Sequence, residues 1–133
     1  MAQGQTALIV DDDERIAEMI GVMLSFDGID VRTARNGLQG YLSYFRNPTD
    51  WVITDVEMPE LNGVEMARCI RAMNPDVKVV YMSGALDDYR SLLNREAKEF
   101  GAKILRKPFT PDSLVEQLSA VEEDDRTAAS VLV

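Results

Sequence analysis

Acidic side chains follow two apolar runs of the sequence at the point where each run ends. Asp11 and Asp12 come directly after residues 6–10, and Asp55 follows residues 51–54. Short continuous apolar runs are typical of strands covered on both faces of a parallel sheet. The carboxyl ends of such strands share one edge of the sheet, where open α/β proteins bind their ligands. We therefore expect these carboxylates to lie together, with Asp55 as the reactive centre.

Two further polar residues follow later apolar runs. Ser83 comes after residues 77–82, and Lys107 comes shortly after residues 102–105. Taken singly, each is most simply a turn or loop residue. Placed in order with the acids, they predict a shared site. Packed carboxylates repel each other, by about 1 kcal/mol per pair at ~4 Å in water and about 4 kcal/mol at an effective dielectric of 20.

A divalent cation would offset this repulsion and screen an incoming phosphoryl group. A site of oxygen ligands, without Cys or His, suits Mg²⁺ or Mn²⁺. The chain has no histidine, which excludes Ser-His and Cys-His catalysis and imidazole metal sites. The chemistry left to the chain uses carboxylates, hydroxyls, lysine or backbone groups.

Composition narrows the partners. The formal charge is 14 − 23 = −9, which argues against nucleic-acid and anionic membrane surfaces as partners. No apolar run approaches the ~18 residues of a membrane span, and residues 1–6 do not resemble a signal peptide. The single cysteine, Cys69, cannot form an internal disulfide, and we read it as a spectator thiol. These features predict a cytoplasmic protein.

Strand and helix patterns alternate along the chain. This order predicts an α/β fold, with a parallel sheet, helices on both faces and right-handed crossovers. We expect one domain at 6–121, an N-terminal extension at 1–5, and an acidic, disordered tail at 122–133. The expected strands are 6–10, 29–34, 51–55, 77–82 and 102–105, and the expected helices are 14–26, 38–45, 63–73, 87–100 and 111–121.

Two helices carry specific side-chain predictions. In the helix at 38–45 we expect Tyr41, Leu42 and Phe45 to face inward. The helix at 87–100 is rather polar, and Glu96 is one of the polar residues that we set against its apolar ones. A helix with few apolar contacts is a candidate moving part.

The ordered motifs resemble the receiver domain of two-component response regulators. The resemblance covers about residues 6–121, and the chain is similar either to single-domain chemotaxis receivers or to a receiver from a hybrid histidine kinase or larger regulator. It implies a flavodoxin-like (βα)5 three-layer sandwich with the strand order 2-1-3-4-5. The motifs are Val10-Asp11-Asp12-Asp13, Asp55 with Met58-Pro59 and Asn62-Gly63, Ser83-Gly84-Ala85, and Lys107-Pro108-Phe109.

The resemblance also implies a role for each site residue. Asp55 would be the phosphoacceptor, forming an acyl phosphate. Asp12, Asp55 and the backbone carbonyl of Glu57 would bind Mg²⁺, with Asp11 helping through water. Ser83 and Lys107 would bind the phosphoryl oxygens, and the Lys107-Pro108 peptide bond would be cis.

The sequence departs from the family pattern at two places. Ile104 stands where receivers usually carry a switch Tyr or Phe, and Arg106 adds an unusual charge beside the lysine. Glu57 and Ala85 occupy the positions that flank the phosphoryl group in the family. We hypothesise that the acidic Glu57 disfavours anionic donors and alters the rate of hydrolysis.

These observations favour a signalling receiver, not a dedicated enzyme. A sensor histidine kinase or histidine phosphotransfer protein would supply the phosphoryl group to an unknown output pathway, and the 86–121 face could form a homodimer. One alternative is a phosphorylation-independent interaction module of the same fold, which Ile104 favours. Another is a phosphatase-type hydrolase with an Asp nucleophile, which would need Glu57 turned inward as its second acid.

Overall fold

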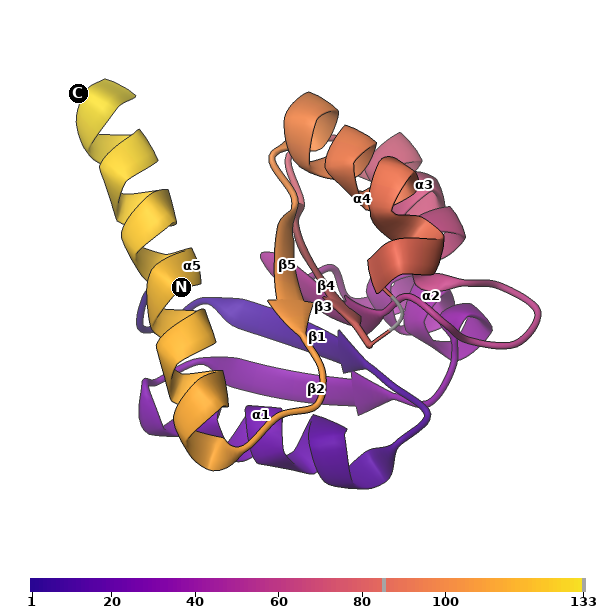
Figure 1. The fold of residues 1–133 in the computed structure, drawn as a ribbon, viewed down its shortest axis with the longest axis horizontal. Helices are drawn as coiled ribbons and strands as arrows, with labels where there is room; N and C mark the ends of the chain where they lie inside the picture. The colour runs from indigo at the N-terminus through magenta and orange to yellow at the C-terminus, as the bar shows by residue number, and fades with distance from the viewer. Residues whose placement is uncertain (85, 133) are drawn as a thin grey trace.

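The structure is a computed structural model that describes the backbone of residues 1–84 and 86–132 and the side chains of 1–84 and 88–121. Strands and helices alternate along the chain, as predicted (Figure 1). The strands are β1 (Thr6–Val10), β2 (Asp30–Ala34), β3 (Trp51–Asp55), β4 (Lys78–Ser83) and β5 (Lys103–Arg106). The helices are α1 (Glu14–Phe26), α2 (Gly37–Arg46), α3 (Gly63–Met73), α4 (Leu86–Phe100) and α5 (Pro111–Leu132).

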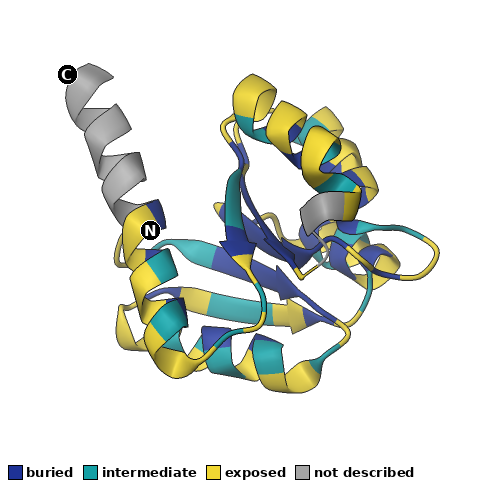
Figure 2. Ribbon diagram, viewed as in Figure 1, coloured by how far each residue is buried: buried dark blue, intermediate teal, exposed yellow. Residues whose placement is uncertain are grey.

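The strands form one parallel sheet in the order β2-β1-β3-β4-β5, so the flavodoxin-like fold is confirmed. Helices α1 and α5 cover one face, and α2, α3 and α4 cover the other (Figure 1). An apolar core lies between the sheet and the helices on each face, and side chains of both the strands and the helices contribute to it. The central strand β3 is buried along its whole length (Figure 2).

The strand register brings the predicted site residues to one edge. Val10 pairs with Thr54, so the residues that follow them, Asp11 and Asp55, emerge side by side. On the other side of β3, Asp55 pairs with Met82. Ser83 then ends β4 one residue beyond that pair. Segments far apart in the sequence therefore deliver their polar residues to a common carboxyl edge.

Helix starts follow the local sequence signals. Asn62 accepts a hydrogen bond from the Glu65 backbone N–H, and the Glu65 side chain accepts one from the Asn62 N–H, which together form a capping box. Asp13 caps α1 by accepting from the Arg15 N–H. These caps fix where α1 and α3 begin, directly after the acid-bearing loops.

The predicted inward face of α2 is confirmed for Tyr41, which packs partly against the core, but is wrong for Leu42 and Phe45. Leu42 and Phe45 are 39% and 65% exposed, whereas Tyr44 is buried. The buried side of the helix instead follows Gly37 and Gly40, together with Tyr44 and the partly buried Tyr41. At Gly40 a Cβ would lie only 2.7 Å from Met66 Sδ, so the missing side chain lets α2 approach the core. Choosing the larger apolar residues as the buried ones hid this glycine face.

Helix α4 also differs from expectation at one position, because Glu96 is fully buried. Its carboxylate meets polar groups of α3 and β4 that the sequence does not show to be neighbours. Helix α5 has a backbone that continues to Leu132, beyond the end near Val121 that we predict. The division into 1–5, 6–121 and 122–133 stays a prediction. Within the described residues, no helix is long and apolar enough to cross a membrane.

Candidate functional site

Three carboxylates meet at the carboxyl edge of the sheet. One oxygen from each of Asp11, Asp12 and Asp55 lies within 4.8 Å of the other two. Asp11 and Asp55 are buried, while Asp12 is exposed to solvent. The cluster is thus open on one side and has oxygen ligands only, which is the donor set that Mg²⁺ and Mn²⁺ prefer.

Lys107 completes the site from the loop after β5. Its Nζ lies 3.0 Å from Asp11 Oδ2 and 3.3 Å from Asp55 Oδ2. Its backbone N–H donates to the Ser83 carbonyl at 3.1 Å, which ties the loop to the end of β4. The Lys107-Pro108 peptide bond is cis, as predicted. The structure therefore brings together Asp11, Asp12, Asp55 and Lys107 from three separate segments.

Burial and charge oppose one another in this cluster. Burial raises the pKa of the Asp55 carboxyl above its ordinary value, and repulsion from Asp11 and Asp12 adds to the rise, against the lowering by Lys107. Burial likewise raises the pKa of Asp11, although the Asp13 backbone N–H and Lys107 counteract it. For Lys107 burial acts to lower the pKa, but Asp11 and Asp55 outweigh it and the pKa is raised. One lysine thus compensates the acids only in part, which favours added positive charge.

The Ser83 hydroxyl is buried without a hydrogen-bond partner among the described residues. Most buried hydroxyls are paired, because leaving one unpaired costs about 1–3 kcal/mol. Ser83 ends the strand that neighbours Asp55 in the sheet, and it lies on the edge that also carries Lys107. An unused donor beside an ammonium suits an anionic group with several acceptor oxygens, such as a phosphoryl group.

The backbone around Asp55 is tightly packed by the start of α3. The Gly63 N–H donates to the Val56 carbonyl at 3.0 Å, and a Cβ on Gly63 would lie 2.1 Å from the Asp55 carbonyl oxygen. The Thr54 hydroxyl donates to that same oxygen at 2.9 Å. The nucleophile candidate therefore stands on a fixed backbone rather than on a mobile loop.

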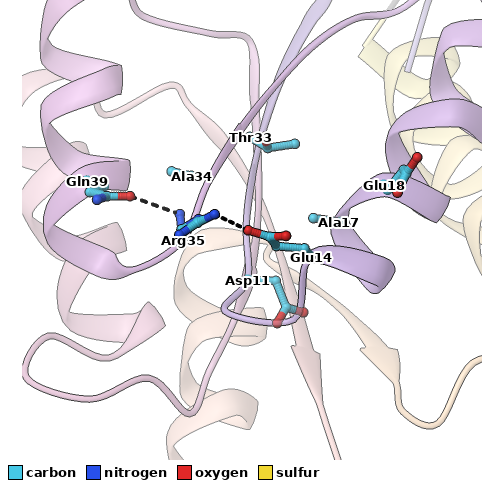
Figure 3. A pocket seen from close by; sticks show the side chains of 8 residues that line it. All are labelled: Asp11, Glu14, Ala17, Glu18, Thr33, Ala34, Arg35 and Gln39. Atoms are coloured by element: carbon cyan, nitrogen blue, oxygen red, sulfur yellow. Dashed lines mark hydrogen bonds and ion pairs between the residues drawn. The ribbon is translucent and has the colours of Figure 1, made fainter.

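A pocket of about 650 Å³ opens beside Asp11, between α1 and the loop after β2 (Figure 3). Arg35 crosses it, forming an ion pair with Glu14, while the Gln39 side-chain oxygen accepts from the Arg35 N–H at 3.3 Å. We did not predict that Glu14, Arg35 and Gln39 would line a pocket beside Asp11. The Arg35-Asn36-Gly37 turn was the available signal, but nothing in the sequence links it to Glu14.

The remaining predicted positions are placed as follows. Ile104 is partly buried against the core under α2, α3 and α4 and pairs with Tyr81 in the sheet. Glu57 is exposed, and the role of its carbonyl stays a prediction. Ala85 lies outside the described residues. Cys69 is a free, exposed thiol on α3.

A parallel five-stranded sheet with an acid triad, a lysine and a serine at its carboxyl edge defines a receiver-type signalling domain. Residues 7–119 match the response regulator receiver domain family, and the chain belongs to that family. This is a family of signal-transduction domains of two-component systems, not of dedicated enzymes.

Individual relatives agree with this assignment. The chain is 35% identical over 115 residues to the transcriptional regulatory protein CpxR homolog of Haemophilus influenzae, covering 86% of this chain and 48% of that protein. A response regulator receiver domain protein from Clostridium thermocellum is 29% identical with a TM-score of 0.73, covering 93% of this chain and 98% of that one. The chain spans about half the length of the curated relatives it matches.

A further solved structure to which the chain is similar is that of a protein in complex with ligands. The response regulator protein TrrA from Thermotoga maritima, in complex with Mg²⁺ and BeF, is 32% identical with a TM-score of 0.71. The alignment covers 87% of this chain and 97% of that one. The acid triad described above is typical of the Mg²⁺ site of receivers.

Proposed function

We propose that Asp55 accepts a phosphoryl group from the phosphohistidine of a sensor histidine kinase or a histidine phosphotransfer protein. The set of groups that surround Asp55 is the observation that supports this proposal. A lysine contacts its carboxylate, a buried serine hydroxyl at the same edge has no partner among the described residues, and two further acids stand within reach of a cation.

The transfer joins an Asp55 carboxylate oxygen to phosphorus while the bond from phosphorus to the imidazole nitrogen breaks. The imidazole leaves with the electron pair of that bond and the phosphoryl group becomes an acyl phosphate. Lys107, which already contacts the Asp55 carboxylate, would bind one phosphoryl oxygen. The Ser83 hydroxyl would donate a hydrogen bond to another. Such fixed donors stabilise the charge of the transferring group without further rearrangement.

The chain's residues also fit a divalent cation. Asp12, Asp55 and the Glu57 backbone carbonyl would hold Mg²⁺ or Mn²⁺ directly, with Asp11 acting through water. When bound, the ion neutralises charge on the phosphoryl oxygens. The exposure of Asp12 supports this role, because an ion that keeps several waters needs an open side.

Phosphorylation would switch a surface that other proteins recognise. The acyl phosphate carries about 1.5 to 2 negative charges in place of the single charge of the Asp55 carboxylate, and the lysine and serine of the site can move to meet them. Moving a two-state surface from 1:99 to 99:1 requires about 5.5 kcal/mol of differential binding. The same proposal includes a cytoplasmic location, an output protein and a homodimer through the 86–121 face. It also includes an effect of Glu57 on the rate at which the acyl phosphate is hydrolysed.

The phosphorylation-independent interaction module is the second candidate, favoured by Ile104 in place of an aromatic residue. Acetyl phosphate and Mg²⁺ separate the two functions. We expect the intact protein to gain the mass of one phosphoryl group, and Asp55→Asn to gain none. Asp50→Asn, which changes an exposed aspartate away from the carboxyl edge, is the matched control and should be phosphorylated normally. No mass gain in the unaltered chain would leave the interaction module as the better account.

A further inference from the structure

A buried polar cluster joins three elements away from the acid triad. It consists of Arg71 on α3, Tyr81 on β4 and Glu96 on α4. The Tyr81 hydroxyl donates to Glu96 Oε1 at 2.5 Å, and Arg71 Nη2 donates to the same oxygen at 2.5 Å and to the Tyr81 oxygen at 3.3 Å. The side chains of Arg71 and Glu96 are only 9% and 1% exposed, and Tyr81 is fully buried.

This cluster is a main attachment of α4 to the domain. Over the stretch of α4 whose side chains are described, 88–100, the buried residues are Leu93 and Glu96. Tyr89 and Leu92 pack against the core only in part. Because a buried carboxylate is strongly unfavourable once its partners are lost, the position of α4 depends on the contacts of Glu96.

The bonds within the cluster can be arranged in two ways. Arg71 and Glu96 meet through one nitrogen and one oxygen, while Arg71 Nη1 and Glu96 Oε2 are buried without a partner among the described residues. A guanidinium and a carboxylate can instead pair through two parallel hydrogen bonds. That pairing would satisfy both unused atoms and would hold the Glu96 carboxylate without the Tyr81 hydroxyl.

The same cluster reaches toward the phosphoacceptor site along β4. Tyr81 lies two residues before Ser83, and alternate residues of a strand point to the same face. Its neighbour in β5 is Ile104, which has neither an aromatic ring nor a hydroxyl to contribute. At the other end, Arg71 lies over the ring of Phe100, with 4.0 Å to the ring centroid. Tyr81 therefore stands between Ser83 on its own strand and Glu96 on α4.

We propose that Arg71, Tyr81 and Glu96 form a polar latch that holds α4 on the sheet and passes a displacement of Ser83 to that helix. The holding role depends only on the contacts above. The transmitting role rests on the proposed phosphorylation of Asp55. In the transmitting step, movement of β4 with Ser83 separates the Tyr81 hydroxyl from Glu96, and Arg71 then takes both carboxylate oxygens.

Amide hydrogen exchange of residues 88–100 tests the latch, with Tyr81→Phe as the variant. This change keeps the ring and removes the hydroxyl. The matched control is Tyr44→Phe, since Tyr44 is also buried and its hydroxyl accepts a hydrogen bond from Asn74 Nδ2 at 2.9 Å. We expect Tyr81→Phe to speed exchange in 88–100 by about tenfold or more, with β1 and β3 unchanged. Tyr44→Phe should leave 88–100 within about twofold of the unaltered chain.

Repeating the exchange with acetyl phosphate and Mg²⁺ tests the transmitting role. Phosphorylation should change exchange in 88–100 in the unaltered chain and in Tyr44→Phe, and change it much less in Tyr81→Phe. Phosphoryl uptake is read by mass on the same samples, so a chain that takes up none refutes the proposed function separately. Should Tyr81→Phe fail to fold, Glu96→Gln replaces it. Exchange in 88–100 that is equal in variant and unaltered chain refutes the latch, and an equal phosphorylation response refutes the transmission.

Discussion

Ser83 and Lys107 occupy the same edge of the sheet but are prepared for an anion in different ways. The Lys107 ammonium already contacts Asp11 and Asp55, so binding a phosphoryl group means redirecting an existing ion pair. The Ser83 hydroxyl has no partner among the described residues and loses nothing by turning toward a new acceptor. The two groups should therefore differ in what their removal does to the unmodified protein.

We expect Ser83→Ala to separate stability from phosphorylation. Removing a buried, unpaired hydroxyl should leave the free energy of unfolding unchanged or raise it by up to about 1 kcal/mol. Loss of one donor to the transferring group should slow phosphorylation by acetyl phosphate at least about tenfold. Urea unfolding and mass measurements over time check both, with Ser83→Thr as the hydroxyl-bearing control. A clear loss of stability in Ser83→Ala would show that the hydroxyl has a structural partner.

The raised pKa values of Asp11 and Asp55 predict how stability depends on pH. Burial is the main cause, so the folded protein holds these protons more tightly than the unfolded chain, whose carboxyls keep a pKa near 3.8. The resulting stabilisation is complete below that value and is lost as the pH rises through the folded pKa. The Asp55→Asn variant has no ionisable group at this position, so it does not undergo the part of this loss of stability that Asp55 causes.

The stability of the Asp55→Asn variant relative to the unaltered chain should thus be greater at about pH 7 than at about pH 4. Urea unfolding in the absence of divalent cations measures both differences. The single variant Asp50→Asn controls for the change in net charge, because it removes one negative charge at an exposed position at the other end of β3. A difference that stays constant between the two pH values would contradict the raised pKa of Asp55.

The first turn of α3 fixes the backbone of Asp55. A Cβ on Gly63 would lie 2.1 Å from the Asp55 carbonyl oxygen and 3.1 Å from Thr54 Oγ1, so Gly63→Ala must push the helix from the strand. We expect a loss of about 1–3 kcal/mol in the free energy of unfolding, together with weakened Mg²⁺ binding.

Gly21→Ala on α1 is the matched control. Its Cβ would meet Val31 at 3.4 Å and Ile9 at 3.8 Å, which are ordinary contacts. The greater helix propensity of alanine should therefore raise stability by up to about 1 kcal/mol. Thermal and urea unfolding distinguish the two variants. Equal stability of both would mean that α3 is not held against Asp55.

The elements were predictable where their signals are local. Helix α1 has the predicted bounds because Asp13 and Glu14 mark its start and Asp27-Gly28 its end. The acid triad follows from strand ends that a parallel sheet must bring together. The burial of Glu96 and the Glu14–Arg35 pair could not be predicted, because each depends on which distant residues face each other after helices pack. On α2 the buried face follows two glycines and Tyr44, whereas the larger apolar residues Leu42 and Phe45 are exposed.

Cations can stabilise this protein, whose net charge is −9, in two separate ways. Any salt screens the diffuse repulsion among the acids on the surface, whatever the valence of the ion. A bound ion acts differently, because its effect requires the oxygens of Asp11, Asp12 and Asp55 within 4.8 Å of one another. A comparison at matched ionic strength separates specific binding from screening.

Magnesium should raise the melting temperature well beyond the effect of NaCl at the same ionic strength. A ligand at 100 times its dissociation constant stabilises the folded state by about 2.7 kcal/mol, which corresponds to roughly 5–15 °C for a domain of this size. Asp12→Asn should lose most of the Mg²⁺ effect because Asp12 is the exposed member of the triad, while Asp112→Asn, an exposed acid in the first turn of α5, should retain it. Differential scanning calorimetry measures all three chains. If Mg²⁺ and NaCl raise the melting temperature equally, the triad acts only as part of the general negative surface, and the proposed cation would have to be abandoned.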